Sequence, residues 1–139
     1  MKKNSLAIIV VSTICCLSTL LGAECVITDT SASPHARLHS AALDDVHWGP
    51  GFWADRFALV RDVTLPHLYE LAADPNYGHA LSNLRIAGGL EEGRFSGTHW
   101  QDAWVYKWLE AAAAVYAITK DPALDARMDE VIAIIRGSA

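Results

Sequence analysis

The sequence predicts an all-α fold, and three features indicate it. Apolar residues recur at steps of three or four along several stretches between residues 54 and 137. A Thr-x-x-Gln pattern and an Asp-Pro pair stand where helices would begin. With 52% hydrophobic and 19% charged residues, the 139-residue chain has the composition of one folded domain, or part of one.

The first folded segment is expected to begin near Val46. Two Trp and one Phe surround the Gly-Pro-Gly turn of residues 49–51, which predicts an aromatic anchoring hook. A helix over 54–72 follows, with an apolar face at residues 57, 60, 64, 68 and 71. Because proline lacks an amide proton, Pro66 predicts a kink or a new helix start near Thr64 and Leu65.

The next stretch, residues 78–97, is glycine-rich and predicts a long loop with one short helix around 81–87. A second long helix is expected over 99–118, where Thr98 and Gln101 form a capping-box pattern. Its apolar stripe comprises Trp100, Trp104, Trp108, Ala112, Val115 and Tyr116. This helical spacing predicts that the three tryptophans are mainly core residues, with a sugar-stacking platform as the alternative.

The last helix should begin at Pro122, with Asp121 as its N-cap, and should end at Gly137. It would form an αα-hairpin with the helix before it. About three helices make only a thin core, so we expect the hairpin to belong to a larger helical assembly.

The first 23 residues have the pattern of a secretory signal peptide. Lys2 and Lys3 precede an apolar run, and Gly22-Ala23 supplies small residues for cleavage after Ala23. The protein is therefore predicted to be secreted or periplasmic. The alternative is an uncleaved anchor, because the run approaches the ~18 residues that begin to span a bilayer. Membrane contact is expected only through such a leader.

Residues 24–45 carry Ser and Pro without apolar periodicity and predict a flexible linker, which leaves 46–139 as the folded domain. Loss of the leader would remove Cys15 and Cys16 and leave Cys25 alone. No intrachain disulfide is then expected. The six histidines lack metal-ligand spacing, so no metal site is predicted within this chain.

The net charge of −5 argues against a broad phosphate-binding surface, so nucleic acid is not a predicted partner.

Four motifs between residues 51 and 113 occur in a recognisable order. They are Gly51-Phe52-Trp53 with Arg56, Asn83-Leu84-Arg85-Ile86-Ala87-Gly88-Gly89, Phe95-Ser96-Gly97, and the run from Gln101 to Ala113. With them, the segment 52–135 resembles the N-terminal part of the β-L-arabinofuranosidase-like family, glycoside hydrolase family 127 and its relatives. One departure is Asp102-Ala103-Trp104, where the family usually has Asp-Ser-Asp.

The resemblance implies a truncated (α/α) toroid catalytic domain followed by β-sandwich elements. It implies a retaining glycosidase that acts at the non-reducing end of plant-type arabinosides, with a cysteine nucleophile at a zinc site and a glutamate acid/base. Those residues would lie downstream of residue 139, so this chain is expected to hold no catalytic residue and to be inactive alone. Zinc is implied for the full-length family and not for this chain.

Candidate sugar contacts lie in the loop region of residues 77–102. Asn83, Arg85, His99 and Asp102 are the predicted substrate-binding residues, if downstream sequence completes the site for a carbohydrate. Asp102 has a second interpretation, since a carboxylate in the first turn of a helix is stabilised by the macrodipole.

The remaining carboxylates do not predict displacement chemistry. Retaining hydrolysis needs two carboxyl groups ~5–5.5 Å apart. Asp102 and Glu110 would lie about 12 Å apart along one helix. Glu91 and Glu92 are expected to be a solvated charge pair, and Glu110 a surface partner of Lys107.

Two other functions stay open on the sequence. Acidic helix hairpins with exposed aromatic residues also suit a small helical interaction module. The same hairpins would suit the start of a different toroid carbohydrate-active enzyme, such as a polysaccharide lyase.

Overall fold

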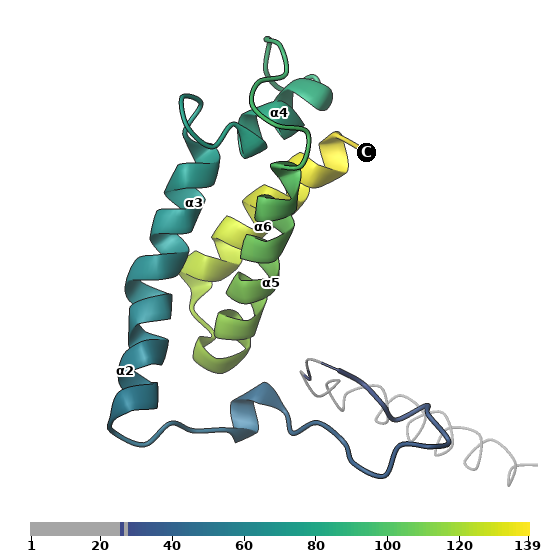
Figure 1. Ribbon diagram of the computed structural model, residues 1–139, viewed down its shortest axis with the longest axis vertical. Helices are drawn as coiled ribbons and strands as arrows, with labels where there is room; N and C mark the ends of the chain where they lie inside the picture. The colour runs from purple at the N-terminus through teal and green to yellow at the C-terminus, as the bar shows by residue number, and fades with distance from the viewer. Residues whose placement is uncertain (1–25, 27) are drawn as a thin grey trace, which may run out of the picture. The chain divides into compact units, whose positions relative to one another are not determined.

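The computed structural model describes residue 26 and residues 28–139 (Figure 1). The predicted signal peptide and all three cysteines lie outside these residues. The chain divides into two compact units, residues 1–42 and 43–139. The described part of the first unit consists of turns and irregular segments. One of its turns is capped by Asp29, whose Oδ1 accepts from the Ser31 N–H at 2.9 Å, which lowers the pKa of that carboxyl.

The second unit is helical. Its elements are η1 (Leu43–Asp45), α2 (Phe52–Leu59), the π-helical segment η2 (Val60–Thr64), α3 (Leu65–Ala73), α4 (Ala80–Ala87), α5 (Asp102–Thr119) and α6 (Pro122–Gly137). No strand occurs in the part of the chain that the structure describes, which confirms the all-α prediction. None of the described helices is both long enough and apolar enough to cross a bilayer.

The segments α2, η2 and α3 form one continuous rod beside α5, while α6 packs on α5 and α4 lies across the ends of α5 and α6 (Figure 1). The rod changes its hydrogen-bond pattern before Pro66. The Leu65 N–H donates to Val60 O, five residues back, and Thr64 Oγ1 donates to Leu59 O at 3.3 Å. A proline cannot donate to the carbonyl four residues earlier, so the wider turn accommodates it. The predicted interruption near Thr64 and Leu65 is confirmed.

The wider turn also changes which face of the rod is buried. Leu65 and Ala72 are buried, while Val60 and Leu68 are 38% and 46% exposed. The predicted apolar face at 57, 60, 64, 68 and 71 was therefore wrong in register for most of its positions. The reason is that a π-helical turn contains more residues than the 3.6 assumed in the periodicity.

The αα-hairpin of α5 and α6 is confirmed. Lys120 turns the chain with φ 53°, and the Asp121 carboxylate accepts from the Ala123 N–H at 2.9 Å as the N-cap of a helix that starts with Pro122. The predicted end at Gly137 is confirmed, although Gly137 does not have the positive φ of a glycine cap. The Ser138 N–H follows it and donates to the carbonyls of Ile134 and Ile135.

Gly88 allows a close approach between α4 and α6. A Cβ on Gly88, at the end of α4, would lie 2.7 Å from the Gly137 carbonyl oxygen. Glycine at this position lets the α4 terminus contact the α6 backbone.

The start of α5 differs from the prediction by three residues. Residues 98–101 form a turn in which the Gln101 N–H donates to Thr98 O at 3.2 Å, and the α-helix begins at Asp102. Half of the predicted capping box is present, because Gln101 Oε1 accepts from the Thr98 N–H at 3.1 Å.

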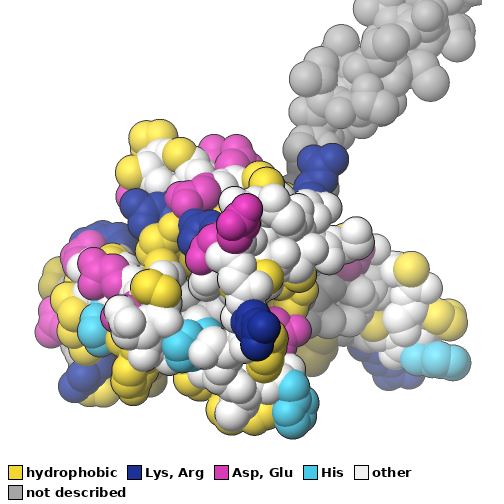
Figure 2. Space-filling view, turned by 90° about the horizontal axis from the view of Figure 1, so that it is seen from above, with side chains coloured by type: hydrophobic (Ala, Val, Ile, Leu, Met, Phe, Trp, Pro, Cys, Tyr) yellow, Lys and Arg dark blue, Asp and Glu magenta, His cyan; other side chains and the backbone are white. Residues whose placement is uncertain are grey.

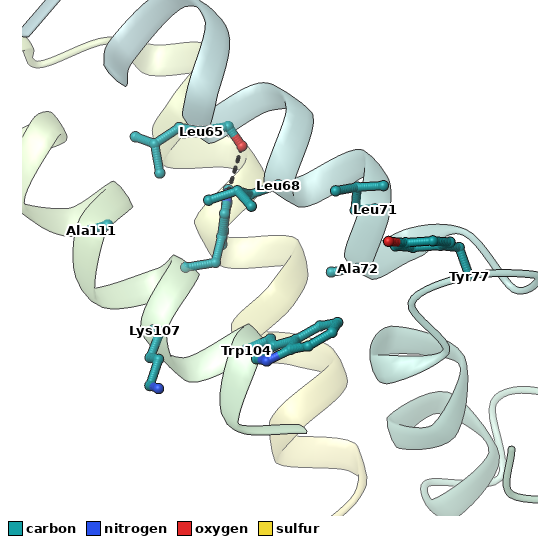
Figure 3. A pocket seen from close by; sticks show the side chains of 9 residues that line it. Leu65, Leu68, Leu71, Ala72, Tyr77, Trp104, Lys107 and Ala111 are labelled. Carbon is teal, nitrogen blue, oxygen red and sulfur yellow. Dashed lines mark hydrogen bonds between the residues drawn. The ribbon is translucent and has the colours of Figure 1, made fainter. Parts of the chain in front are cut away.

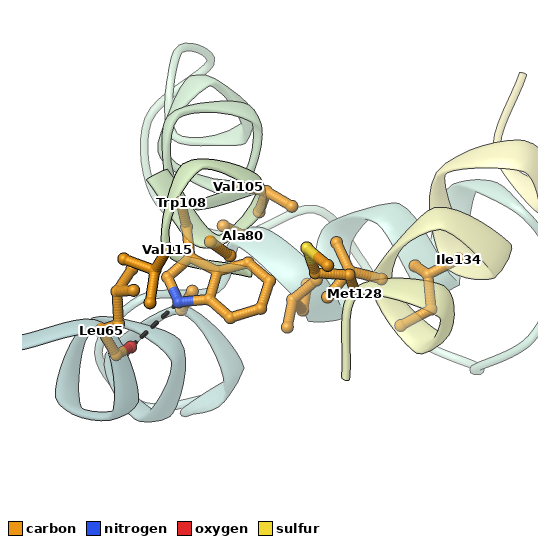
Figure 4. Close-up of a cluster of buried hydrophobic side chains, with 11 residues drawn as sticks. Leu65, Ala80, Val105, Trp108, Val115, Met128 and Ile134 are labelled. Atoms are coloured by element: carbon orange, nitrogen blue, oxygen red, sulfur yellow. Dashed lines mark hydrogen bonds between the residues drawn. The ribbon is translucent and has the colours of Figure 1, made fainter. Parts of the chain in front are cut away.

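The core lies between α3, α5 and α6, with α4 closing one end (Figure 4). Its buried side chains are Leu65, Ala72, Ala80, Leu81, Val105, Trp108, Ala112, Val115, Met128, Val131 and Ile134. Trp108 is 5% exposed, and its indole N–H donates to Leu65 O at 2.9 Å. Trp100 and Trp104 are 50% and 39% exposed, so the prediction of three core tryptophans holds for Trp108 alone.

Candidate functional site

A hollow of about 200 Å³ lies where α4, the loop of residues 93–101 and the first turn of α5 meet. Its lining combines apolar and polar side chains: Asn83, Leu84, Ala87, Phe95, Thr98, His99 and Asp102. Three of the four predicted sugar-contacting residues therefore share one concave surface. A concave site with an apolar floor and a few polar groups is the usual form of a small-molecule site.

Asn83 holds the loop in place. Its Nδ2 donates to Ser96 O at 2.8 Å, and its Oδ1 accepts from the Ser96 N–H at 3.0 Å. This pair of bonds fixes Ser96 against α4 across thirteen residues of chain. The amide of Asn83, predicted as a sugar ligand, is thus engaged with the backbone beside Phe95.

Gly97 allows the loop to turn back toward α5. Its φ is +81°, a conformation that L side chains rarely adopt, and a Cβ there would meet the carboxamide of Gln101 and the ring of His79. Gln101 is itself buried at 9% exposure. The loop is therefore held by specific polar bonds and by the absence of a side chain at one position.

His99 and Asp102 are exposed at the rim of the hollow. In the described part of the chain, neither side chain makes a hydrogen bond or an ion pair. Their donors and acceptors are free to meet a ligand. The other interpretation of Asp102 keeps its electrostatic basis, since it occupies the first turn of α5, but its side chain makes no cap bond.

Arg85 does not line the hollow. Its Nη2 lies 3.4 Å from Glu130 Oε1 on α6, and the same oxygen accepts from the Tyr69 hydroxyl at 3.2 Å. Arg127 Nε is 3.8 Å from Glu130 Oε2, and its guanidinium lies over the Tyr69 ring at 4.3 Å. Arg85 thus connects α4 to α6 and α3, a role that its spacing from Asn83 did not indicate.

This cluster also affects the acidity of Tyr69. Partial burial raises the pKa of the Tyr69 phenol, and the nearby Glu130 carboxylate raises it further. The guanidinium groups of Arg127 and Arg85 oppose that effect.

The other predicted carboxylates, Glu91, Glu92 and Glu110, are exposed. Glu91 is exposed, and its Oε1 accepts from Ser82 Oγ at 2.8 Å. The predicted contact between Lys107 and Glu110 is absent from the ion pairs of the described residues. Within residues 28–139, no group of three or more His, Cys, Asp or Glu side chains is close enough to hold a metal ion. The described side chains therefore do not fit a zinc site on their own.

A second concave surface is an apolar groove of about 340 Å³ between α3 and α5 (Figure 3). Leu65, Leu68, Leu71, Ala72, Tyr77, Trp104, Lys107, Trp108 and Ala111 line it. Lys107 supplies its one charged group, and the ring of Trp104 lies along one side in the close-up. The side chains suit the packing of another apolar element better than the binding of a polar ligand.

Charge on the face seen in Figure 2 is mixed. Acidic, basic and histidine side chains alternate there with exposed apolar ones, and no area of a single sign covers it.

A comparison of the sequence with models of protein families identifies the family. Residues 45–137 match the model of the β-L-arabinofuranosidase, glycoside hydrolase family 127 catalytic domain. The chain belongs to glycoside hydrolase family 127. This excludes the alternative that the hairpins start a different class of toroid enzyme.

Two relatives in this family are similar over parts of the chain. The non-reducing end β-L-arabinofuranosidase of Bifidobacterium longum subsp. longum is 44% identical over 57 residues, which are 41% of this chain and 9% of the relative. The crystal structure of a β-L-arabinofuranosidase from Geobacillus stearothermophilus T6 superposes with a TM-score of 0.64 at 35% identity. That match covers 67% of this chain and 15% of the Geobacillus enzyme. The chain thus spans a small part of the length of both relatives.

Within this family 127 chain, sequence reasoning missed the contribution of Phe95 and Thr98 to the hollow. Phe95 belongs to the Phe95-Ser96-Gly97 motif and lies between Gly93 and Gly97, so an aromatic ring in a glycine-rich segment was the available signal. For Thr98 the sequence indicates only a capping role, because it does not show where the loop folds back.

Proposed function

We propose that this chain forms the N-terminal part of the catalytic domain of a secreted or periplasmic glycoside hydrolase. Its reaction would be release of β-L-arabinofuranosyl residues from the non-reducing end of plant-type arabinosides. The observation that carries the proposal is the family match over residues 45–137. The Bifidobacterium and Geobacillus relatives are both β-L-arabinofuranosidases, which supports the choice of substrate. The lysine-led apolar leader supports export.

The architecture proposed for the whole domain is an (α/α) toroid. In such a fold, helix hairpins pack side by side, so each hairpin needs an apolar face for its neighbour. The groove between α3 and α5, with Leu68 and Trp104 partly exposed on it, supplies such a face.

The chain alone is proposed to be inactive. Retaining hydrolysis requires a nucleophile and an acid/base across one bond. Family resemblance assigns the cysteine nucleophile, the zinc and the glutamate to sequence beyond residue 139. The part of the chain described here would bind the sugar through His99 and Asp102 at the hollow.

A chimera tests the proposed function. Residues 45–137 would replace the matching segment of the Geobacillus enzyme, and hydrolysis of an aryl β-L-arabinofuranoside would be measured. We expect the chimera to turn over the substrate. The purified chain, with or without zinc, should give no turnover above background. A folded chimera that hydrolyses another glycoside instead of the arabinofuranoside would contradict the proposal.

A further inference from the structure

Helix α4 forms one wall of the hollow. Asn83, Leu84 and Ala87, three of the seven residues that line it, lie on this helix. Asn83 also holds Ser96 through two hydrogen bonds, so α4 fixes the loop that carries further lining residues. The shape of the hollow therefore depends on how α4 is rotated about its own axis.

The apolar contacts of α4 define that rotation only in part. The helix has eight residues, and its buried residues are Ala80 and Leu81, both in its first turn. Its N-cap residue, His79, makes no side-chain cap bond. A helix this short is marginal in water without tertiary contacts. Polar bonds to neighbouring helices are therefore needed to hold the rest of α4.

Arg85 supplies such a bond on the side of α4 away from Asn83. Successive residues of an α-helix are about 100° apart around the axis, so Asn83 and Arg85 are separated by about 200°. Arg85 Nη2 lies 3.4 Å from Glu130 Oε1 on α6. The helix is thus anchored to the loop on one side and to α6 on the other.

The Glu130 carboxylate is itself held by groups from two other positions. The Tyr69 hydroxyl of α3 donates to the same Oε1 at 3.2 Å, and Arg127 Nε lies 3.8 Å from Oε2. The Arg127 guanidinium lies over the Tyr69 ring at 4.3 Å. An isolated exposed ion pair contributes little, but a network of several groups restrains its members together.

We infer that Glu130 is a positioning residue for the substrate site. Through Arg85 it sets the rotation of α4, and thereby the wall made by Asn83, Leu84 and Ala87. Glu130 does not line the hollow and acts without touching the substrate. The inference rests on the proposed function for the statement that the hollow holds the substrate.

The first test measures whether Glu130 is coupled to the loop. In the ¹⁵N-labelled chain, Glu130→Ala should shift the backbone amides of residues 96–99, although it lies on another helix. Arg85→Ala should shift the same amides. The double variant should shift them no further, because both changes remove one contact.

Two variants serve as controls. Glu130→Gln keeps an oxygen that accepts from Arg85 and Tyr69, so its amides at 96–99 should stay near wild type. Glu110→Ala removes an exposed carboxylate of α5 that makes no ion pair among the described residues, and it should shift none of them. If Glu130→Ala lowers the helical circular dichroism, Arg85→Ala reports on the same contact from its other end.

The second test is kinetic and uses the chimera that carries residues 45–137. Glu130→Ala should raise KM for the aryl β-L-arabinofuranoside about three- to tenfold and leave kcat within about twofold, because the wall contacts the sugar in the ground state and the transition state alike. Glu130→Gln should keep the KM of the parent chimera, and so should Glu110→Ala. A general loss of folded protein would lower the apparent kcat and leave KM unchanged.

Three results would overturn the inference. These are unshifted amides at 96–99 in both Glu130→Ala and Arg85→Ala, additive shifts in the double variant, or an active chimera with equal KM in Glu130→Ala and Glu110→Ala. Failure of the proposed function is read separately, from hydrolysis by the parent chimera. An inactive parent rejects only that function, and the amide shifts then decide whether Glu130 positions the wall.

Discussion

The helical core and the loop of residues 93–101 are held together in different ways. In the core, eleven buried side chains from α3, α4, α5 and α6, Trp108 among them, exclude water. In the loop, residues 93–100 are exposed, and the chain is held by the Asn83 amide, the Gln101 amide and glycines with positive φ. The core depends on apolar area, and the loop depends on a few directional bonds.

This difference determines how each region responds to change. Apolar burial is spread over many contacts, so only large deletions in the core are severe. Directional bonds and positive φ angles tolerate few residue types, so small changes in the loop should have local and specific effects.

Trp108→Ala should have the largest effect on stability, because it disrupts the helical core. It removes a nearly buried indole and its bond to the Leu65 carbonyl, and Trp→Ala changes in cores cost about 3–5 kcal/mol. We expect loss of most helical signal by circular dichroism at 25 °C. Trp100→Ala, at a half-exposed position, is the control and should retain it.

Gly97→Ala should be the most damaging small change in the loop. The positive φ and the contact with the Gln101 carboxamide predict a cost of about 1–3 kcal/mol, concentrated near the hollow. Hydrogen exchange should speed up for amides of residues 93–101 and stay unchanged in α6. At Gly49 an added Cβ would have nothing within 4 Å, so Gly49→Ala is the control. Equal exchange rates in the two variants would contradict the account of the loop.

Asp121→Ala tests whether a directional bond matters in the core region as well. Loss of the cap to the Ala123 N–H should cost about 1 kcal/mol, measured as a lower urea midpoint. Asp121→Asn keeps a capping oxygen and should stay near wild type. A similar loss in both variants would indicate that charge, and not the cap, stabilises the start of α6.

The alkaline response of Tyr69 should be the smallest effect. Its pKa is raised in the folded state by partial burial and by Glu130, so the folded state favours the protonated phenol. The resulting stability is present below the unfolded pKa of about 10 and is lost as pH rises through the folded value. Above pH ~10, the free energy of unfolding of the wild type should therefore fall more steeply with pH than that of Tyr69→Phe, measured by urea denaturation.

Tyr77→Phe, at an exposed position, should keep the wild-type profile. Some alkaline sensitivity should persist in both variants, since the Asp125 carboxylate also raises the pKa of Tyr116.

The sequence predicted the core region well where local rules act alone. The spacing of α5 and α6 and the Asp121-Pro122 start were sufficient for the hairpin, because capping and periodicity are local. The buried face of α3 was missed because one π-helical turn before Pro66 shifts the register.

The loop was less predictable because its contacts join residues far apart in sequence. Asn83 and His99 were correctly assigned to one region, but the bonds from Asn83 to Ser96 depend on how the loop folds back. Arg85 pairs with Glu130, forty-five residues away, which no local pattern indicates. Trp100 and Trp104 follow the helical stripe of Trp108 but are 50% and 39% exposed, which the spacing alone does not indicate.

The π-helical segment η2 has a consequence for the evolution of this chain. Successive residues of an α-helix are rotated by about 100° around the helix axis. Removing one residue from 60–64 would therefore rotate α2 by about that angle relative to α3. The aromatic cluster of Phe52 and Trp53, with rings 5.0 Å apart, would then face a different direction. A single codon deletion in this segment would therefore change the face that α2 presents.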